Sequence, residues 1–461
     1  MHAHDLTRRS FLHGTMAAAG AAALGAPARA LGAGGRYEPT WESLDSHPLP
    51  RWFDDAKIGI FIHWGIFSVP AWAPRGRYAE WYPNDMRNVG GPTYEYHRAT
   101  YGADFAYRDF IPMFRAERWD PDEWAQLFRD AGARYVVPVG EHHDGFPLWD
   151  TRTTDWNARR MGPRRDLVRD LGRSVRSLRM RYAPSYHQLL NYYAPQYDAP
   201  HPLYLSEAYV DQWMLPQLRE LIERYEADML WLDGDWMASA ETFKTKELTA
   251  WYYNRRKDVL VNDRLGQVRS RHGDFYTAEY DYNSDQGIEH KWENTRGCGA
   301  SFGFNRNEPP EDYMTEAELL ELLVKSVAYW GNLLLNVGPA ADGTINDIQR
   351  DLLGAMGRWL RRNGDGIYGT RFWRVQESST REGQTLYYTA KGDDVFAFVV
   401  GRPGRTVTLP AADLPELRKG DRVRLLGSHR PLDWERRGPD VVVELPRTLP
   451  EQPIHGLHLR R

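Results

Sequence analysis

The sequence predicts an α/β fold in which a (β/α)8-like barrel is followed by a small antiparallel β-sandwich. Short apolar runs alternate with amphipathic helical patterns over about 300 residues, which is typical of parallel strands joined by helices. Polar residues follow nearly every apolar run, as they do at the carboxyl ends of barrel strands. Near Gly369 the helical periodicity stops, and short segments separated by Gly, Pro and Asp predict the sandwich.

Helical patterns make up one half of the alternation. Asp120 and Pro121 supply a capping residue and a proline at the first helical position. Thr315 and Glu318 have the spacing of a capping box, and Gly364 fits a helix end. The predicted helices cover residues 120–131, 166–179, 207–225, 242–256, 315–330 and 347–362.

Short apolar runs make up the other half. The predicted strands cover residues 58–62, 135–139, 182–186, 229–232, 259–261, 301–304 and 333–337. These seven runs and a less distinct eighth favour a closed barrel over an open doubly wound sheet. No glycine-rich dinucleotide fingerprint follows the first run, which also argues against the open sheet.

The C-terminal part is predicted to contain strands without helices. The boundary is expected at residues 368–371, which gives a barrel domain over 31–369 and a sandwich domain over 370–461. The predicted sandwich strands cover residues 385–390, 395–400, 405–409, 422–426 and 441–445.

Residues 1–30 have the pattern of a twin-arginine signal peptide. Arg8 and Arg9 precede an Ala/Gly-rich run, and the segment closes on an A-x-A site that ends at Ala30. The run is too short and too weakly apolar to span a membrane. We therefore expect export of the folded chain to the periplasm or beyond, cleavage after Ala30 and no remaining membrane anchor. A disordered Ala-rich tail is the alternative.

Charge and cysteine content exclude some classes of partner. The net charge is −4 and no basic block occurs, so neither nucleic acid nor an anionic membrane surface is an expected partner. The lone Cys298 cannot form an internal disulfide. The 18 tryptophans suit either a large core or stacking on sugar rings.

Asp233 ends one of the predicted buried strands. The run from Met229 to Leu232 is apolar, and a carboxylate at its end is costly unless the group has a function or a partner. A catalytic acid and an acid that caps the following helix are both compatible with this position.

The ends of the other predicted strands are also polar. Because the carboxyl ends of barrel strands meet at one rim, we expect these side chains to converge on a pocket. The residues at the strand ends are His63, His142 and His143, Tyr186 and His187, Asp233, Asn262 to Arg264, Glu279, Phe302 and Asn336.

Histidines at such a rim could hold a metal ion or hydrogen-bond a polar substrate. His142 and His143 are adjacent, so in a strand they point to opposite faces, and no His-x-His or His-Glu-x-x-His spacing occurs. His63, Asp233 and one of that pair could still form a metal site, although we expect neither metal nor cofactor. Neutral imidazoles, an arginine and two carboxylates suit sugar hydroxyls and glycoside hydrolysis.

Eight blocks in order, from about residue 50 to residue 370, resemble the α-L-fucosidases of glycoside hydrolase family 29. These blocks are Phe-Ile-His-Trp-Gly from Phe61, Tyr-Ala-Glu-Trp-Tyr from Tyr78, His-His-Asp-Gly-Phe from His142, Trp-Leu-Asp-Gly from Trp231, Asn-Asp-Arg from Asn262, Thr-Ala-Glu-Tyr from Thr277, Ser-Phe-Gly-Phe-Asn from Ser301 and Leu-Leu-Asn-Val-Gly-Pro from Leu334.

The resemblance implies a retaining exo-α-L-fucosidase that acts on fucosylated oligosaccharides or glycoconjugates. It implies that Asp233 is the nucleophile, that Glu279 is the acid/base, and that Arg264 lies beside Asp233. Other carboxylates near Glu279 in the sequence are alternatives for the acid/base: Asp281, Asp285, Glu289 and Glu293.

The resemblance also implies a fucose pocket with a polar side and an apolar wall for the C6 methyl group. A hydroxyl at C6 would lack a partner against that wall, which would favour fucose over galactose. The residues implied for the hydroxyl groups are His63, Glu80, Trp81, His142, His143 and Tyr186, and those for the wall are Phe61, Trp231 and Phe302.

Two other functions remain open, namely a fucose-binding protein without activity and a metal-dependent hydrolase. The loops at 87–110 and 236–246 are expected to shape the aglycone side, since specificity varies in loops.

Overall fold

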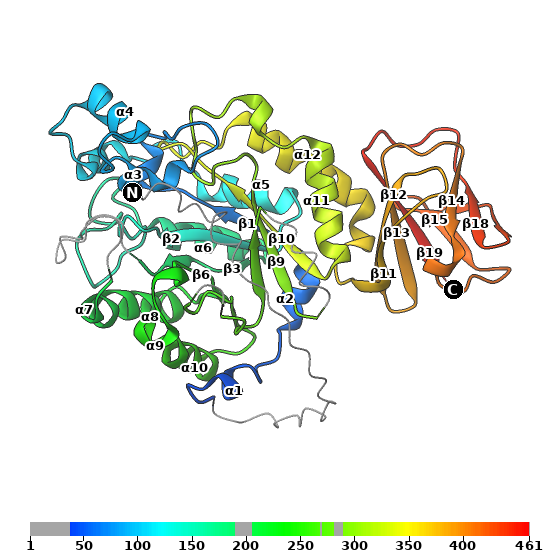
Figure 1. The fold of residues 1–461 in the computed structure, drawn as a ribbon, viewed down its shortest axis with the longest axis horizontal. Helices are drawn as coiled ribbons and strands as arrows, with labels where there is room; N and C mark the ends of the chain where they lie inside the picture. The colour runs from blue at the N-terminus through cyan, green and yellow to red at the C-terminus, as the bar shows by residue number, and fades with distance from the viewer. Residues whose placement is uncertain (1–36, 190–204, 268–269, 281–288, 461) are drawn as a thin grey trace. The chain divides into compact units, whose positions relative to one another are not determined.

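A computed structural model describes residues 37–189, 205–267, 270–280 and 289–460 (Figure 1). The contacts divide the chain into residues 1–36 and one compact unit, Tyr37–Arg461. The predicted signal peptide lies outside the described residues. None of the described helices is long and apolar enough to cross a membrane.

Parallel strands form a (β/α)8-like barrel, which confirms the predicted fold class. Hydrogen bonds connect them in the order β6-β4-β2-β1-β10-β9-β8, and β5 pairs with β7. A parallel bridge between Asn262 and Phe275 connects the segment after β7 to the segment before β8. The strands are β1 (Ile58–Ile62), β2 (Tyr135–Glu141), β3 (Arg181–Tyr182), β4 (Ser185–His187), β5 (Met229–Leu230), β6 (Leu232–Asp233), β7 (Leu260–Val261), β8 (Tyr276–Glu279), β9 (Trp292–Gly297) and β10 (Gly331–Val337).

The prediction of a strand at 301–304 was wrong. This segment is a loop, and the Ser301 hydroxyl donates to the Gly303 carbonyl oxygen at 2.6 Å. The Gly303 amide donates to the Glu80 carboxylate at 2.8 Å. In a strand this amide would donate to a carbonyl oxygen of a neighbouring strand, whereas here a side chain accepts the hydrogen bond. The barrel strand in this part of the chain is β9 instead. Its sequence is polar although most of its residues are buried, so the sequence pattern did not indicate a strand.

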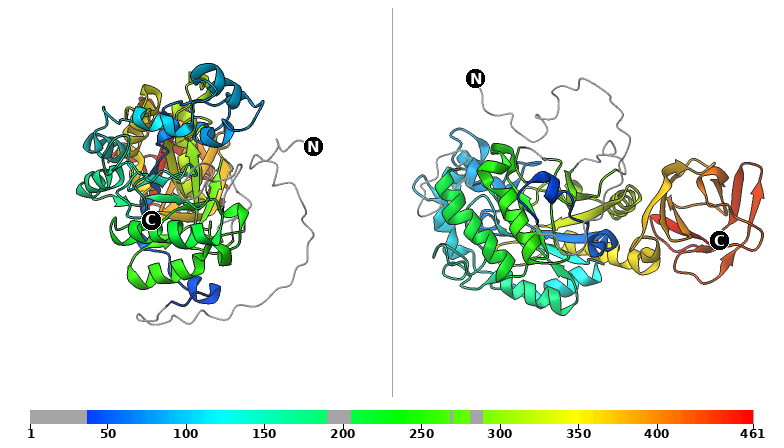
Figure 2. Two further views of the ribbon diagram at one scale, coloured as in Figure 1. Left: turned by 90° about the vertical axis from the view of Figure 1, so that its left-hand side faces the viewer. Right: turned by 90° about the horizontal axis from the view of Figure 1, so that it is seen from below.

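Helices flank the barrel strands (Figures 1 and 2). Every predicted helical segment contains a helix, but 207–225 includes a π-helical turn, and 242–256 breaks at Lys244 (φ 56°). The Asp120 cap and the Thr315–Glu318 capping box are confirmed. These helices are α5 (Pro121–Asp130), α6 (Leu167–Ser177), α7 (Glu207–Tyr209), η5 (Val210–Met214), α8 (Leu215–Glu223), α9 (Ala240–Phe243), α10 (Thr245–Arg255), α11 (Glu316–Ala328) and α12 (Asp347–Asn363).

Several short helices lie in segments with no strong periodicity, so the sequence did not reveal them. They include η3, which carries Glu80 and Trp81, and η6, which directly follows Asp233. They are α1 (Trp41–Leu44), α2 (Arg51–Ala56), η2 (Ile66–Ser68), η3 (Ala79–Trp81), α3 (Tyr82–Asp85), α4 (Pro92–Tyr101), η4 (Tyr107–Met113), η6 (Asp235–Met237), η8 (Pro310–Asp312), η9 (Gly364–Gly366) and η10 (Ala411–Asp413).

Two antiparallel sheets follow the barrel and confirm the predicted sandwich. A six-stranded sheet has the order β11-β12-β13-β19-β15-β16, and a three-stranded sheet has the order β14-β18-β17. Leu386 and Val395 of the first sheet share a buried cluster with Val407 and Val443 of the second. The strands are β11 (Arg371–Ser379), β12 (Thr385–Lys391), β13 (Asp394–Val400), β14 (Thr406–Pro410), β15 (Arg422–Leu425), β16 (Pro431–Leu432), β17 (Trp434–Arg437), β18 (Asp440–Glu444) and β19 (Ile454–Arg460).

The sandwich also packs against the helices α11 and α12. The Trp359 indole donates to the Ile454 carbonyl oxygen at 2.9 Å, and Phe396 and Phe398 belong to the same buried cluster as Trp359. A boundary at 369/370 precedes β11, and it remains a prediction.

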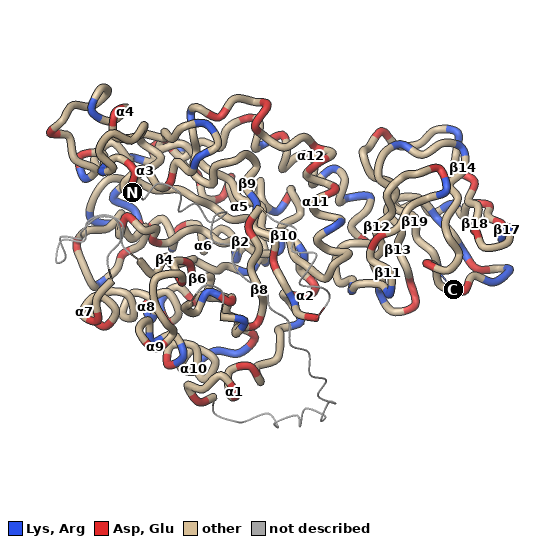
Figure 3. Tube along the Cα trace, in the orientation of Figure 1, with Lys and Arg blue, Asp and Glu red and all other residues tan. Residues whose placement is uncertain are grey.

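Acidic and basic residues are interspersed along the described chain (Figure 3). This distribution agrees with the mildly acidic composition and the absence of a basic block in the sequence.

Candidate active site

The parallel barrel brings the polar strand ends together, as expected. Asp233 ends β6, His187 ends β4 and Glu279 ends β8, while His63 directly follows β1. The His187 Nε2 atom lies 3.2 Å from Asp233 Oδ2, so at least two strand ends meet at hydrogen-bond distance.

Asp233 is buried and lies between one guanidinium group and two imidazoles. Arg264 Nη1 donates to Asp233 Oδ1 at 2.5 Å, and His143 Nε2 lies 4.0 Å from Asp233 Oδ2. Gly234 has φ +91°, a conformation that L side chains rarely adopt, and a Cβ there would lie 3.1 Å from the His143 ring. The glycine therefore lets the chain turn immediately after the carboxylate.

Arg264 joins the two predicted catalytic carboxylates. Its Nη2 donates to Glu279 Oε1, and its Nε donates to Thr277 Oγ1 at 3.0 Å. Asp263 in turn accepts from the Thr277 hydroxyl at 2.8 Å. Burial lowers the pKa of Arg264, but Asp233 and the other nearby carboxylates outweigh it and raise the pKa overall. The guanidinium therefore stays charged between two carboxylates.

Gln188 connects the backbones that carry Asp233 and Arg264. Its backbone amide donates to the Asp233 carbonyl oxygen at 2.7 Å, and its side-chain amide donates to the Arg264 carbonyl oxygen at 2.9 Å. The side chain is fully buried. Gln188, which follows β4, thus fixes the backbone at the end of β6 relative to the backbone after β7.

The histidines of the site are buried, and two have fixed protons. His63 Nδ1 lies 2.7 Å from Asn336 Oδ1, and His143 Nδ1 lies 2.7 Å from the Leu189 carbonyl oxygen. Both oxygens accept, so each Nδ1 carries a hydrogen. Burial, followed by the neighbouring His187, lowers the pKa of His142 well below its usual value. His142 is therefore a neutral imidazole at ordinary pH.

Two overlapping clusters of the site could also hold a metal ion. Ligand atoms of His63, His142 and His187 lie within 4.8 Å of one another, and so do those of His143, His187 and Asp233. The donor set, imidazole nitrogens with one carboxylate, is chemically suitable for zinc or a similar ion. Imidazoles can also donate to and accept from hydroxyl groups, so the same clusters suit a polar substrate.

Glu80 and Trp81 come from η3, in the segment between β1 and β2. Burial raises the pKa of Glu80 to about 7, and its carboxylate accepts from the Gly303 amide at 2.8 Å. The Trp81 ring centre lies 5.1 Å from that of His143 and 6.3 Å from that of Trp236. Trp81 therefore contacts His143 of the site, and Glu80 binds the loop that carries Phe302.

The three predicted wall residues lie together. The Phe61 ring centre is 4.7 Å from the ring of Trp231 and 4.5 Å from that of His63. The Phe302 ring stacks on His63 with centres 5.0 Å apart. An apolar surface thus adjoins the polar cluster.

The structure places Tyr186 away from the site. Adjacent strand residues point to opposite faces, so Tyr186 faces the helices while His187 faces Asp233. The Tyr186 hydroxyl donates to Gln217 Oε1 at 2.7 Å. His187 occupies the position expected for Tyr186, and strand alternation was the signal that could have identified it.

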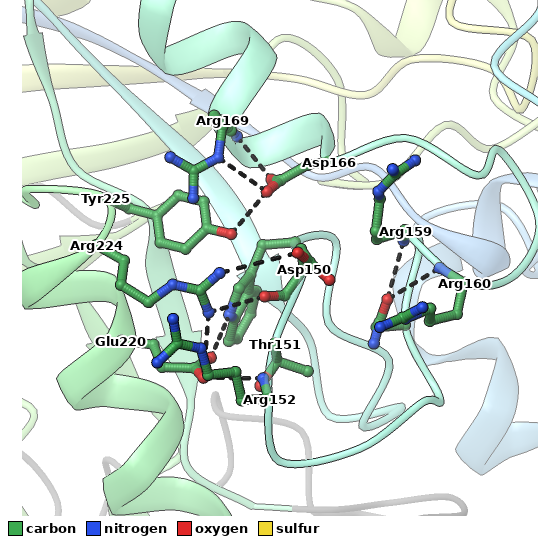
Figure 4. Close-up of polar contacts among 12 residues, drawn as sticks. Asp150, Thr151, Arg152, Arg159, Arg160, Asp166, Arg169, Glu220, Arg224 and Tyr225 are labelled. Carbon is green, nitrogen blue, oxygen red and sulfur yellow. Dashed lines mark hydrogen bonds and ion pairs between the residues drawn. The ribbon is translucent and has the colours of Figure 1, made fainter.

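The loop after β2 is anchored to α8, outside the barrel (Figure 4). Glu220 accepts from the Trp149 indole at 3.0 Å and from the Arg152 amide at 2.8 Å. Arg224 donates to the Asp150 carbonyl oxygen at 2.8 Å. The network thus fixes residues 149–152 of the loop that begins with His142 and His143.

These contacts define a class of enzyme, a barrel hydrolase with two carboxyl groups on one arginine beside buried imidazoles and an aromatic wall. The model of the family "Alpha-L-fucosidase" matches residues 26–365. The chain belongs to the α-L-fucosidase family.

Individual relatives agree with this assignment. Tissue alpha-L-fucosidase of Rattus norvegicus is 38% identical over 432 residues, which cover 90% of this chain and 89% of that protein. The crystal structure of Thermotoga maritima alpha-fucosidase in complex with a mechanism-based inhibitor is 40% identical, with a TM-score of 0.83, and covers 92% of this chain and 100% of its own. The same enzyme in complex with fucose has a TM-score of 0.82 at 40% identity, with the same coverage.

Proposed function

We propose that this protein is a retaining exo-α-L-fucosidase, which hydrolyses terminal α-L-fucosyl residues of glycans or glycoconjugates. The observation that carries the proposal is the pair Asp233 and Glu279, bound to two nitrogen atoms of Arg264 at the carboxyl ends of the strands. Family membership and the likeness to the fucose complex of the Thermotoga maritima enzyme support the substrate.

The proposed reaction has two displacements at the anomeric carbon. Asp233 attacks C1, the bond from C1 to the glycosidic oxygen breaks, and that oxygen takes a proton from Glu279. Glu279 then removes a proton from water, the water oxygen bonds to C1, and Asp233 leaves. Two inversions return the α configuration, and the net change is hydrolysis.

Arg264 has a different effect on each carboxyl group in this scheme. Its charge favours the ionised form of Asp233, which the nucleophile needs. The same charge opposes protonation of Glu279, which must donate a proton first. We infer that the bound sugar separates Glu279 from Arg264 before the first displacement.

The pocket is proposed to distinguish fucose by its hydroxyl groups and its methyl group. Neutral His142 can donate to one hydroxyl group and accept from another, whereas His63 and His143, whose Nδ1 protons bind Asn336 and Leu189, can each accept through Nε2. Glu80 and Trp81 complete this polar side, and His187 takes the role expected for Tyr186. Phe61, Trp231 and Phe302 form the wall for the C6 methyl group.

The stereochemistry of the product tests the proposal directly. The enzyme is mixed with an aryl α-L-fucoside, and proton NMR spectra are recorded before mutarotation. The first product is expected to be α-L-fucose. Initial β-L-fucose would contradict the two-step mechanism, and lack of any turnover would favour a binding protein.

A metal-dependent hydrolase is the second candidate, because of the two ligand clusters. Activity after dialysis against a chelator separates the two candidates. Unchanged kcat/KM is expected, since Asp233 and Glu279 suffice for the chemistry. A loss that added zinc restores would favour the metal enzyme.

We also propose that residues 1–30 are a twin-arginine signal that directs the folded chain out of the cytoplasm. The support is the order of paired arginines, Ala/Gly-rich run and A-x-A site. N-terminal sequencing of the exported protein is expected to begin at Leu31. A mature protein that starts at Met1 would contradict cleavage.

A further inference from the structure

Glu293 lies inside the barrel, below the proposed sugar pocket, and both its oxygens accept hydrogen bonds. The Tyr135 hydroxyl donates to Oε1 at 2.5 Å, and the Trp231 indole donates to Oε2 at 2.8 Å. Glu293 belongs to β9, Tyr135 to β2, and Trp231 lies between β5 and β6. One fully buried carboxyl group therefore joins three separate parts of the barrel wall.

The fold makes specific room for this arrangement. Gly59 of β1 pairs with Tyr135 in the register of the sheet, and a Cβ at Gly59 would overlap the Tyr135 ring. Only glycine at this position lets the phenol lie across the barrel interior toward Glu293. The contact between Tyr135 and Glu293 therefore depends on the backbone of β1 as well as on the Tyr135 side chain of β2.

Trp231 connects this carboxyl group to the reacting groups. Its ring lies 4.7 Å from that of Phe61, and the Arg264 guanidinium carbon lies 5.2 Å from the indole centre. A guanidinium over an aromatic face is attracted by it. Arg264 in turn binds Asp233 and Glu279. Rotation of the indole would displace both the wall and the arginine.

We propose that Glu293 is a positioning residue, which fixes the Trp231 indole and thereby sets the apolar wall and the place of Arg264 between the two catalytic carboxyl groups. This role rests on the proposed function and replaces the alternative in which Glu293 is the acid/base. Its carboxyl group is already occupied by Tyr135 and Trp231 in the barrel interior.

The charge of Glu293 is set by the groups around it. Burial raises the pKa of Glu293 to about 7, while Tyr135, Trp231 and Lys291 lower it and Asp263 raises it. The ionised form can accept from both Tyr135 and Trp231. Protonation turns one oxygen into a donor, so the Tyr135 hydroxyl must then accept instead. The environment of the Trp231 indole is therefore expected to change near neutral pH.

Steady-state kinetics with an aryl α-L-fucoside test the positioning role. Glu293→Leu removes both acceptors, and a fall in kcat/KM of about 100-fold is expected, the scale of a small misplacement in a site. Glu293→Gln should recover most of this loss, because its amide can accept from Trp231 and donate to Tyr135. Asn294→Ala is the matched control, since Asn294 is also buried on β9 but hydrogen-bonds Ser326 of α11. The proposal is wrong if Glu293→Leu and Asn294→Ala behave alike.

The indole N–H resonance of Trp231 gives a readout that a merely structural role would not move. In ¹⁵N-tryptophan-labelled enzyme, assigned with Trp231→Phe, this resonance should shift with a midpoint near pH 7 in the parent chain and stay constant in Glu293→Gln. A pH-independent Trp231 resonance in the folded parent chain would overturn the proposal that Glu293 fixes the Trp231 indole. If Glu293→Leu does not fold, Tyr135→Phe replaces it, and a shifted Trp231 resonance with reduced kcat/KM is expected.

This design separates the two proposals. A chain without fucosidase activity whose Trp231 resonance still titrates would refute the proposed function and leave the contact between Glu293 and the indole in place. An active chain whose Glu293 variants keep the parent kcat/KM would refute the positioning role alone.

Discussion

Asp233 combines properties that are costly for a carboxylate on its own. It is 6% exposed, and Arg264, His187 and His143 lie around it. A buried carboxylate is tolerated only with such partners. Its position at the end of strand β6 places this carboxylate, together with its partners, where the proposed nucleophile would act.

Replacement of Asp233 by glycine tests its role as the nucleophile. Asp233→Gly should lower kcat for an aryl α-L-fucoside by roughly 10³-fold or more, because no covalent intermediate can form. Added azide should restore part of the rate by attacking C1 in place of the carboxylate. Asp228→Asn is the control, since Asp228 lies before β5 and binds the Tyr182 amide and Arg181. A variant with near-normal kcat would remove Asp233 from the mechanism.

Buried acids predict how stability depends on pH. Burial raises the pKa of Glu80 and of Glu293 from 4.5 to about 7. Between these values the folded chain holds protons that the unfolded chain has released, so stability falls as pH rises through this range. Each group contributes a slope of up to about 1.4 kcal/mol per pH unit. Above pH 7 the contribution becomes constant.

Urea unfolding at pH 5, 6, 7 and 8 measures this dependence. Glu80→Gln and Glu293→Gln should each make the fall in unfolding free energy between pH 5 and pH 7 less steep. Glu311→Gln is the control, because Glu311 is exposed and pairs only loosely with Arg75 at 3.5 Å. Equal slopes in all four proteins would contradict the assignment.

At the scale of elements, the turn between β6 and η6 decides where Asp233 points. Gly234 and Gly383 share a φ of +91°, but a Cβ at Gly234 would lie 3.1 Å from the His143 ring, whereas a Cβ at Gly383 would meet nothing within 4 Å. The two glycines therefore share a left-handed φ but differ in their surroundings.

This pair gives a controlled test of the turn. Both Gly234→Ala and Gly383→Ala should lose about 1 kcal/mol of stability from the left-handed backbone. Only Gly234→Ala should also lower kcat/KM, by about 10- to 100-fold, because His143 or Asp233 must move. Chemical denaturation and kinetics on the same preparations measure both effects. Equal kcat/KM in the two variants would show that the turn tolerates a side chain.

At the scale of the whole described chain, the sandwich covers an apolar face of the barrel helices. Trp359 of α12 and Ile367 are buried in one cluster with Phe398 and Ile454 of the sandwich. Removal of the sandwich would expose these side chains, and exposed apolar area of this kind promotes association. The two predicted domains are therefore expected to depend on each other.

A chain truncated after residue 369 tests this dependence. Compared with the chain from residue 37 onward, it should unfold at a lower temperature and form aggregates, as measured by thermal denaturation and light scattering. The Phe398→Ser variant of the longer chain should show a smaller change in the same direction. A monomeric truncated barrel with an unchanged Tm would show that the two parts are independent.

The sequence by itself determined the fold class, most barrel strands and a helix within each of the six predicted helical segments, and it placed Asp233 and Glu279 at strand ends, where the structure shows both bound to Arg264. The roles of the predicted pocket residues stay predictions. The strands and helices could be predicted because their periodicities are local features of the sequence. In addition, a polar residue at the end of a buried strand costs free energy unless it has a partner or a function, so it marks a candidate site. Short apolar runs such as 58–62 therefore matched the structure closely.

Only the tertiary structure decided which face of its strand each end residue lies on and which side chains contact one another. It moved Tyr186 out of the site, brought His187 to Asp233 and showed β9, whose polar sequence has no apolar period. It also assigned Glu293 to the barrel interior, where Tyr135 and Trp231 meet it from other strands. These outcomes depend on contacts between residues far apart in the chain, and local patterns carry no information about such contacts.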